Sequence, residues 1–231
     1  PQGVDYIGKL QGLHGARYRW FLEGKWAAAE GMVIPMWDPA VHLVDWDQVP
    51  ELGWYMAGLD FGFNAPGCLQ VWGFTGKQNE PLAEQRGYRV AEVYRKGWTI
   101  EQWAQTSMEL RQEFGFNIGV ADSADPGSIK FLNDYLGPRR GRSSGGLFRG
   151  ADKTKGVAAG LELLRSVMAD EPAREEGGVL YPGGPRCFFV RDAQIYGIQP
   201  ELRNEGKETS FETEVESYVF PEDGGTKVVG D

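Results

Sequence analysis

Residues 54–74 read WYMAGLDFGFNAPGCLQVWGF, two apolar runs that a short turn separates. The turn NAPG at 64–67 combines asparagine, proline and glycine, which is typical of a tight connection between strands. The two runs therefore predict antiparallel strands over 54–61 and 68–74. Asp60 is the one acid of the stretch, and it stands where the first strand ends.

The sequence that follows this hairpin continues the same sheet. A polar loop leads to YRVAEVYR (88–95), which predicts a third strand and so an antiparallel meander. Thr99 then begins a helix that has Glu101 and Gln102 in its first turn and ends at Gly115. The segment FNIGVAD (116–122) predicts a fourth strand, which we expect to be parallel to a strand of the meander because a helix precedes it.

Two more helices and one strand complete the pattern. SIKFLNDYL (128–136) predicts a short helix that Ser123 or Asp125 caps, an apolar stripe predicts another helix over 154–169, and RCFFVRD (186–192) predicts a fifth strand. The order strand, strand, strand, helix, strand, helix, helix, strand is that of a ribonuclease H-like fold. We therefore expect an α/β domain with a mixed five-stranded sheet and helices on both faces.

The ends of the chain differ in composition from this middle part. Residues 1–50 are rich in Trp, Gly and Pro and predict an arm and linker, whereas 51–231 would form the domain, with one short strand in ESYVF (216–220). There is no initiator Met, so we expect an excised fragment. No apolar stretch approaches the ~20 residues of a membrane span, so no membrane partner is expected. Cys68 and Cys187 lie in apolar runs and are interpreted as reduced core residues of a cytosolic protein.

Asp60 and Asp122 each end an apolar strand, in YMAGLD and NIGVAD. If the first and fourth strands are parallel neighbours, the two carboxylates meet at the carboxyl ends of the strands, where α/β sheets bind ligands. Two carboxylates at such a short distance repel each other, so either one of them keeps a proton or a cation neutralises both. Oxygen ligands without a nearby His or Cys cluster favour Mg²⁺ or Mn²⁺ over zinc. The alternative is that Asp60 opens a turn and Asp122 caps a helix, which are common roles for Asp.

Basic residues are concentrated in one glycine- and serine-rich segment of a chain whose formal net charge is −9. Such a segment is suited to following a phosphate backbone without reading its sequence. A solvated loop or a contact with another domain are the alternatives. The candidate DNA-binding residues are Arg139, Arg140, Arg142, Arg149, Lys153 and Lys155.

Four stretches resemble the C-terminal nuclease domain of the large terminase subunit of tailed bacteriophages. They are RYRWFLEGKWAAAEGMVIPMWD (17–38), AGLDFGFNAPGCLQVW (57–72), GVADSADPGSIKFL (119–132) and ADKTKGVAAGLELL (151–164). The resemblance implies a ribonuclease H-like endonuclease that cuts concatemeric viral DNA during genome packaging, by two-metal phosphodiester hydrolysis. It also implies double-stranded DNA, the ATPase motor half, the portal and the small terminase subunit as partners, and a location in the host cell cytoplasm rather than in the mature virion.

By position, the resemblance assigns Asp60 and Asp122 as metal ligands, and Asp125 as a cap or supporting group. The family completes its metal cage with an acid in an Asp-His-x-x-Asp-Ala segment, whereas this sequence stops at VVGD. Asp231 is therefore the expected third ligand, and Asp192 and Glu216 are alternatives by chemistry alone.

Three other functions were compared with the sequence: an ATPase, an actin-like phosphotransferase and a non-catalytic DNA-binding module. The phosphate-loop pattern GxxxxGK[ST] does not occur, so no ATPase activity is expected from this chain. An actin-like phosphotransferase would need a Thr or Ser in the turn after the first strand, where the chain has FNAPG, and a duplicated domain that 231 residues do not accommodate. A non-catalytic DNA-binding or docking module, whose acids only cap turns, is the non-enzymatic alternative.

Overall fold

The computed structural model describes residues 32–138, 145–154, 156–170, 172–181 and 183–219. These residues divide into two compact units, one formed by 38–199 and a smaller one formed by 32–37 with 200–219. The larger unit contains the sheet together with Asp60, Asp122, Arg149 and Lys153.

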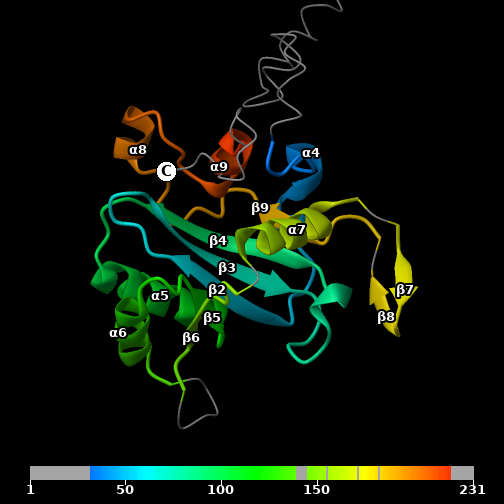
Figure 1. Ribbon diagram of the computed structural model, residues 1–231, viewed down its shortest axis with the longest axis horizontal. Coiled ribbons are helices and arrows are strands. Elements are labelled where there is room, and N and C mark those ends of the chain that lie inside the picture. Colours follow the sequence, from blue (N-terminus) through cyan, green and yellow to red (C-terminus); the bar gives the residue numbers. More distant parts are fainter. Residues whose placement is uncertain (1–31, 139–144, 155, 171, 182, 220–231) are drawn as a thin grey trace, which may run out of the picture. The chain divides into compact units, whose positions relative to one another are not determined.

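A seven-stranded mixed sheet forms the larger unit, in the order β1-β9-β4-β3-β2-β5-β6 (Figure 1). The meander β2-β3-β4 is antiparallel, whereas β5 is parallel to β2, β6 to β5, β9 to β4 and β1 to β9. The predicted parallel pairing of the first and fourth strands is thereby confirmed. The strands are β1 (Leu43–Val44), β2 (Trp54–Asp60), β3 (Gly67–Phe74), β4 (Gly87–Arg95), β5 (Gly119–Ala121), β6 (Phe148–Gly150) and β9 (Cys187–Val190).

The sheet has seven strands, so the predicted number of five was wrong. The two additional strands, β1 and β6, contain two and three residues. Segments this short leave no alternating pattern in the sequence, and each is held by pairing with one parallel neighbour. Residues 43 and 44 thus join the sheet although they lie in the predicted arm. The boundary at residue 50 stays a prediction.

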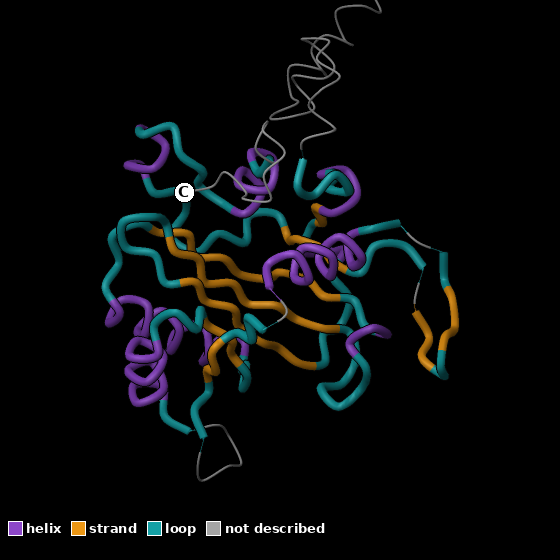
Figure 2. Tube along the Cα trace, viewed as in Figure 1, coloured by secondary structure: helices purple, strands orange, loops and turns teal. Residues whose placement is uncertain are grey.

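Helices cover both faces of the sheet, as predicted (Figure 2). Leu69 and Val71 of β3 belong to the same core cluster as Trp103 and Leu110 of α5 (Ile100–Phe114). Trp72, which points to the opposite face, lines an apolar pocket together with residues of α7 (Gly156–Met168). The helix α6 (Pro126–Leu136) packs with α5 and supplies Leu132 and Leu136 to the core.

The ends of α5 follow the sequence signals. The hydroxyl of Thr99 and the side chain of Gln102 form a capping box at its start, and Gly115 ends the helix with a φ of 71°. This left-handed conformation is accessible to glycine at little cost. Trp103 and Leu110 are buried on one stripe, so the apolar periodicity of the sequence corresponds to the face that packs on the sheet.

Shorter elements complete the larger unit. They are α4 (Pro39–His42), η1 (Trp46–Gln48), η2 (Leu82–Glu84) and a separate hairpin of β7 (Arg174–Glu176) with β8 (Val179–Tyr181). In the part of the chain that the structure describes, no helix is both long and apolar enough to span a membrane.

The smaller unit contains α8 (Pro200–Asn204) and α9 (Phe211–Ser217). Ser210 caps α9 by accepting a hydrogen bond from the backbone N–H of Thr213, and the ring of Phe211 contacts Trp37 edge-on. The prediction of a strand over 216–220 was wrong for its first two residues, which belong to α9. Among the described residues of this segment, Val219 makes an isolated bridge, with Met32. The cap at Ser210 favours a helix that extends to Ser217, and this preference exceeds the β-propensity of the segment 216–220 at its first two residues.

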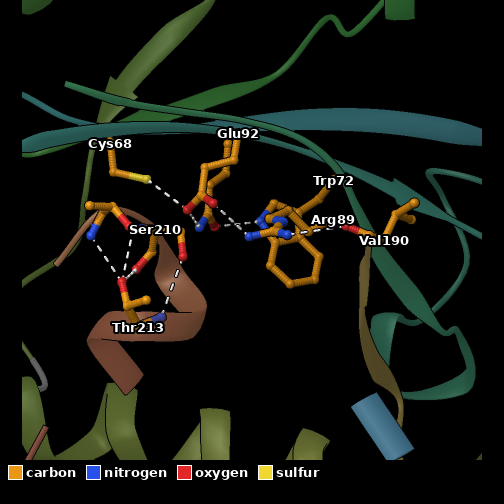
Figure 3. A network of polar contacts seen from close by, with 9 residues as sticks. Cys68, Trp72, Arg89, Glu92, Val190, Ser210 and Thr213 are labelled. Carbon is orange, nitrogen blue, oxygen red and sulfur yellow. Dashed lines mark hydrogen bonds and ion pairs between the residues drawn. The ribbon is translucent and has the colours of Figure 1, made fainter. Parts of the chain in front are cut away.

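A buried ion pair lies inside the sheet, between Arg89 and Glu92 of β4 (Figure 3). The two side chains are 1% and 0% exposed and 2.7 Å apart. The other carboxylate oxygen of Glu92 accepts hydrogen bonds from Gln70 at 3.2 Å and from the Cys68 thiol at 3.5 Å, and Arg89 also donates to the carbonyl of Val190. Several partners thus compensate the desolvation of both charges, as a buried pair requires.

Candidate functional site

The candidate site lies where β2 and β5 end side by side. Leu59 pairs with Ala121 in the parallel register, and the N–H of Asp122 donates to the carbonyl of Leu59 at 3.0 Å. Asp60 follows Leu59 directly and Asp122 follows Ala121. The two acids therefore occupy equivalent positions at the carboxyl ends of neighbouring parallel strands, as the sequence predicted.

The pleat of the strands places both acids on the same face. Leu59 and Ala121 are buried, at 4% and 1% exposed. Because side chains alternate between the two faces of a strand, Asp60 and Asp122 project from the opposite face. Asp60 is exposed and the Asp122 side chain is 31% exposed, so both carboxyl groups reach solvent.

The hairpin turn after Asp60 is built tightly on glycine. A Cβ on Gly62 would lie 2.1 Å from the backbone nitrogen of Gly67, and a Cβ on Gly67 would lie 2.7 Å from the carbonyl oxygen of Asp60 and 2.8 Å from the ring of Trp103. Only residues without a side chain allow these approaches. The packing of α5 under this turn fixes the backbone that carries Asp60.

The environment of Asp60 disfavours its ionised form. Although Asp60 reaches solvent, the protein atoms around its carboxyl partly desolvate it, which raises its pKa above the usual value; the negative charge of Asp122 raises the pKa further, while Lys153 acts in the opposite direction. Repulsion between two adjacent carboxylates is the electrostatic condition that a bound cation relieves.

Asp122 has the opposite shift, because it is already compensated. A hydrogen bond from the ammonium of Lys153 lowers the pKa of Asp122, and the backbone N–H of Ala124, which donates at 3.0 Å, lowers it further. The contact with Lys153 is an ion pair to Oδ1. Sequence reasoning missed this contact, since it assigned Lys153 only to the basic segment.

Asp125 has the capping role that the sequence suggested. Its carboxylate accepts from the N–H of Ser128 at 3.0 Å and from the Ser128 hydroxyl at 2.5 Å, which caps α6. Both oxygens are used within the helix start.

A third acid is not found beside this pair in the described part of the chain. Asp231 lies outside the described residues. Asp192 follows β9, which is separated from β2 by β4 and β3, or about 14 Å at the usual strand spacing. Glu216 belongs to α9 of the smaller unit. Among the residues that the structure describes, no three His, Cys, Asp or Glu side chains gather as a metal cluster.

The basic segment is described only in part. Arg139, Arg140, Arg142 and Lys155 lie outside the described residues. Arg149 is exposed on β6, and Lys153 lies three residues beyond the end of that strand, 60% exposed. Because β6 is parallel to β5, these two cations flank the edge where Asp60 and Asp122 lie.

Solved structures share this arrangement of strands and helices. A structure of the large terminase of a thermophilic bacteriophage matches over 87% of this chain with a TM-score of 0.57 and 18% sequence identity. The chain has the fold of a large terminase nuclease domain. The nuclease domain of the P22 large terminase also matches, over 87% of this chain and 84% of that one, with a TM-score of 0.52 and 14% identity.

The match to the large terminase of the thermophilic phage covers 41% of that protein's length. No protein-family model matches the sequence, and no curated protein matches it. At these identities the terminase structures establish the ribonuclease H-like fold. A shared fold does not fix the chemistry, which depends on the residues of this chain.

The carboxylates present fit a hard divalent cation. Asp60 and Asp122 offer oxygen ligands on one face, and the pKa of Asp60 is raised first by desolvation and then by the negative charge of Asp122. Mg²⁺ is commonly held by one or two carboxylates together with water and substrate phosphate. The chemistry of the pair is therefore compatible with a magnesium or manganese site of this kind.

Proposed function

We propose that this chain is the nuclease part of a large terminase, a divalent-metal-dependent endodeoxyribonuclease that cuts concatemeric viral DNA during packaging. The supporting observation is the pair Asp60 and Asp122, which end neighbouring parallel strands on one face of a terminase nuclease fold. The proposed substrate is double-stranded DNA. The proposed setting is the host cell cytoplasm.

Asp60 and Asp122 would hold Mg²⁺ or Mn²⁺, and Asp231 remains the proposed third ligand. The ions would supply activation of a water and stabilisation of the leaving oxygen in phosphodiester hydrolysis. The contribution of the chain is to hold two carboxylates on rigid strand ends. The tight glycine turn after Asp60 and the backbone bond between Asp122 and Leu59 fix that edge.

The cations beside this edge would hold the DNA backbone. Arg149 on β6 is exposed, and the basic residues at 139, 140, 142 and 155 extend the same region of the sequence. Contacts of this type position the duplex without reading bases. The ATPase motor half, the portal and the small terminase subunit are the proposed protein partners. ATP hydrolysis is not proposed for this chain, since its sequence lacks the phosphate-loop pattern.

A plasmid-cutting assay tests the proposal. We expect the 231-residue chain to relax or degrade plasmid DNA with Mn²⁺ or Mg²⁺, and Asp60→Asn and Asp122→Asn to lose this activity while still binding DNA. Asp134→Asn is the matched control, because Asp134 is an exposed acid of α6 that pairs with Lys130. Cutting by both site variants at the level of the control would refute the site.

DNA binding has its own test, in the Asp60→Asn background so that no cutting occurs. Replacing Arg139, Arg140 and Arg142 together should weaken binding equally for all sequences. Arg149→Gln should do the same and lower the slope of log affinity against log salt by about one for each lost phosphate contact. An unchanged slope would exclude these residues from the DNA interface.

The non-catalytic DNA-binding module remains as a second candidate, because the described residues contain two acids at the edge and not three. Metal-independent DNA binding without cutting, under conditions where Mn²⁺ is bound, would favour it. Cutting that depends on Asp60 would exclude it.

A further inference from the structure

Lys153 makes a contact that the proposed nuclease reaction does not by itself require. Its ammonium forms an ion pair with Oδ1 of Asp122, at the position where a metal ligand is proposed. The two residues are separated by 31 positions in the sequence, so the fold and not local chain geometry brings them together. The Lys153 side chain is 60% exposed and yet is directed to this carboxylate.

The backbone after β6 positions Lys153 beside Asp122. The strand β6 runs parallel to β5, and the pairing continues past the strand end because the N–H of Ala151 donates to the carbonyl of Ala121 at 2.8 Å. The carboxylate of Asp152 then accepts from the N–H and hydroxyl of Thr154, at 2.9 Å and 2.6 Å. This turn holds the segment that carries Lys153 beside the end of β5.

Lys153 acts on both acids of the site. Its ammonium forms an ion pair with Asp122, and its positive charge also acts on the neighbouring carboxylate of Asp60. One positive charge therefore partly compensates two carboxylates. A divalent cation would supply the same compensation with twice the charge.

We infer that Lys153 is a built-in counterion that competes with the divalent cation for Asp122 and so sets the metal affinity of the site. This inference rests on the proposed function. Oδ1 of Asp122 already accepts from Lys153 and from the N–H of Ala124. A cation that binds through Oδ1 must displace the ammonium. One that binds through the other oxygen still meets the repulsion of an ammonium at ion-pair distance.

A displaced Lys153 remains at the same edge of the sheet. It lies on the segment that follows β6, near exposed Arg149, where a DNA phosphate would offer it a second anionic partner. Lys153 is thus a positioning residue with two anionic partners, the carboxylate before metal binding and the phosphate after it. It does not take part in bond making.

Direct metal titration tests the inference without DNA and without an activity readout. Mn²⁺ binding to the 231-residue chain is followed by electron paramagnetic resonance, for the wild type, Lys153→Gln, Lys153→Arg and the control Lys130→Gln. Lys130 is matched, since it is an exposed lysine, 77% accessible, whose ammonium also pairs with an aspartate.

Lys153→Gln should bind Mn²⁺ about threefold to tenfold more tightly than the wild type, because the competing charge of a partly exposed pair is removed. Lys153→Arg should bind Mn²⁺ more weakly than the wild type by about twofold or more, because a guanidinium can donate two parallel hydrogen bonds to one carboxylate. Lys130→Gln should leave the affinity unchanged. A merely structural role of Lys153 would not produce an Mn²⁺ affinity that decreases in the order Gln, Lys, Arg at this position.

Thermal unfolding gives a second measurement. In the presence of a chelator, Lys153→Gln should unfold at a lower temperature than the wild type, and Mn²⁺ should raise its midpoint by more than it raises that of the wild type. A variant that folds poorly is recognised by its circular dichroism, and the Arg variant then carries the test.

The outcomes separate this inference from the proposed function. Mn²⁺ binding that is lost in Asp60→Asn but has the same affinity in all Lys153 variants would overturn the inference alone. Failure of the wild type and of Lys153→Gln to bind Mn²⁺ would overturn both. Tighter binding by Lys153→Gln, dependent on Asp60, supports both.

Discussion

The buried ion pair inside the sheet leads to a sharp prediction about stability. In Arg89→Met, the guanidinium is replaced by a neutral side chain while the carboxylate of Glu92 stays 0% exposed. Removing one partner of a buried pair leaves an uncompensated charge in the interior, which costs several times more than losing an exposed pair.

The magnitude follows from the contacts that remain. Glu92 keeps its hydrogen bonds from Gln70 at 3.2 Å and from the Cys68 thiol at 3.5 Å, so part of its desolvation is still compensated. We therefore expect the lower end of the usual range, a loss of about 3 kcal/mol in the free energy of unfolding. This corresponds to a fall of roughly 6–12 °C in the unfolding midpoint for a chain of this size.

Urea unfolding followed by tryptophan fluorescence measures the loss. The control is Lys130→Met, which removes an exposed pair with side chains 77% and 66% accessible and should cost less than about 1 kcal/mol. The double variant Arg89→Met with Glu92→Gln buries no charge. It should recover at least half of the loss, because an uncharged amide can keep the hydrogen bonds of the carboxylate.

Two results would refute this reasoning. If Arg89→Met were no less stable than Lys130→Met, the pair would not be buried as the structure has it. If the double variant were as unstable as the single one, the loss would come from packing of the Arg89 side chain and not from the charge that remains on Glu92.

Three further predictions follow from the site and the core. With a chelator at pH 7.5, Asp60→Asn should raise the unfolding midpoint and Asp122→Asn should lower it, since the folded chain raises the pKa of the first carboxyl and lowers that of the second. A carboxylate whose pKa is raised by folding destabilises the folded chain at pH values above that pKa. A carboxylate whose pKa is lowered stabilises the folded chain until the pH falls through its folded pKa, so both differences in midpoint from the wild type should shrink below about pH 4. If both variants shifted the midpoint in the same direction, the reasoning would be contradicted. Burial raises the pKa of the Cys187 thiol to about 12, so iodoacetamide at pH 8 should leave Cys187 unmodified until urea unfolds the chain, as mass spectrometry would detect. Gly67→Ala should destabilise the chain by about 1–3 kcal/mol, because the new Cβ meets an α5 ring and a backbone carbonyl, whereas Gly58→Ala, with nothing within 4 Å of its new Cβ, should cost less than about 0.5 kcal/mol in the same urea assay.

Much of the sheet could be predicted because its strands carry strong local signals. β2, β3 and β4 are seven to nine residues long, with apolar patterns and turn residues between them. The parallel position of β5 followed from the helix that precedes it. Asp60 and Asp122 could be paired for the same reason, since each ends one of two strands that the topology makes neighbours.

The remaining features depend on contacts that the sequence pattern does not record. β1 and β6 are held by their neighbours, and nothing in two or three residues distinguishes a strand from a loop. The ion pair of Lys153 with Asp122 depends on the parallel addition of β6 beside β5. A lysine in a basic run of sequence predicts charge but does not identify its partner.

The two short strands also decide how the sheet ends. β1 and β6 are its outermost strands in the described part of the chain, with two and three residues, and the last of these carries the exposed Arg149. A long flat edge would offer a row of unpaired backbone groups to the strand of another copy. Here each outermost strand is shorter than an ordinary strand and so offers few unpaired backbone groups, and β6 also carries the positive charge of Arg149. The architecture that places the acids therefore also protects the chain against edge-to-edge aggregation.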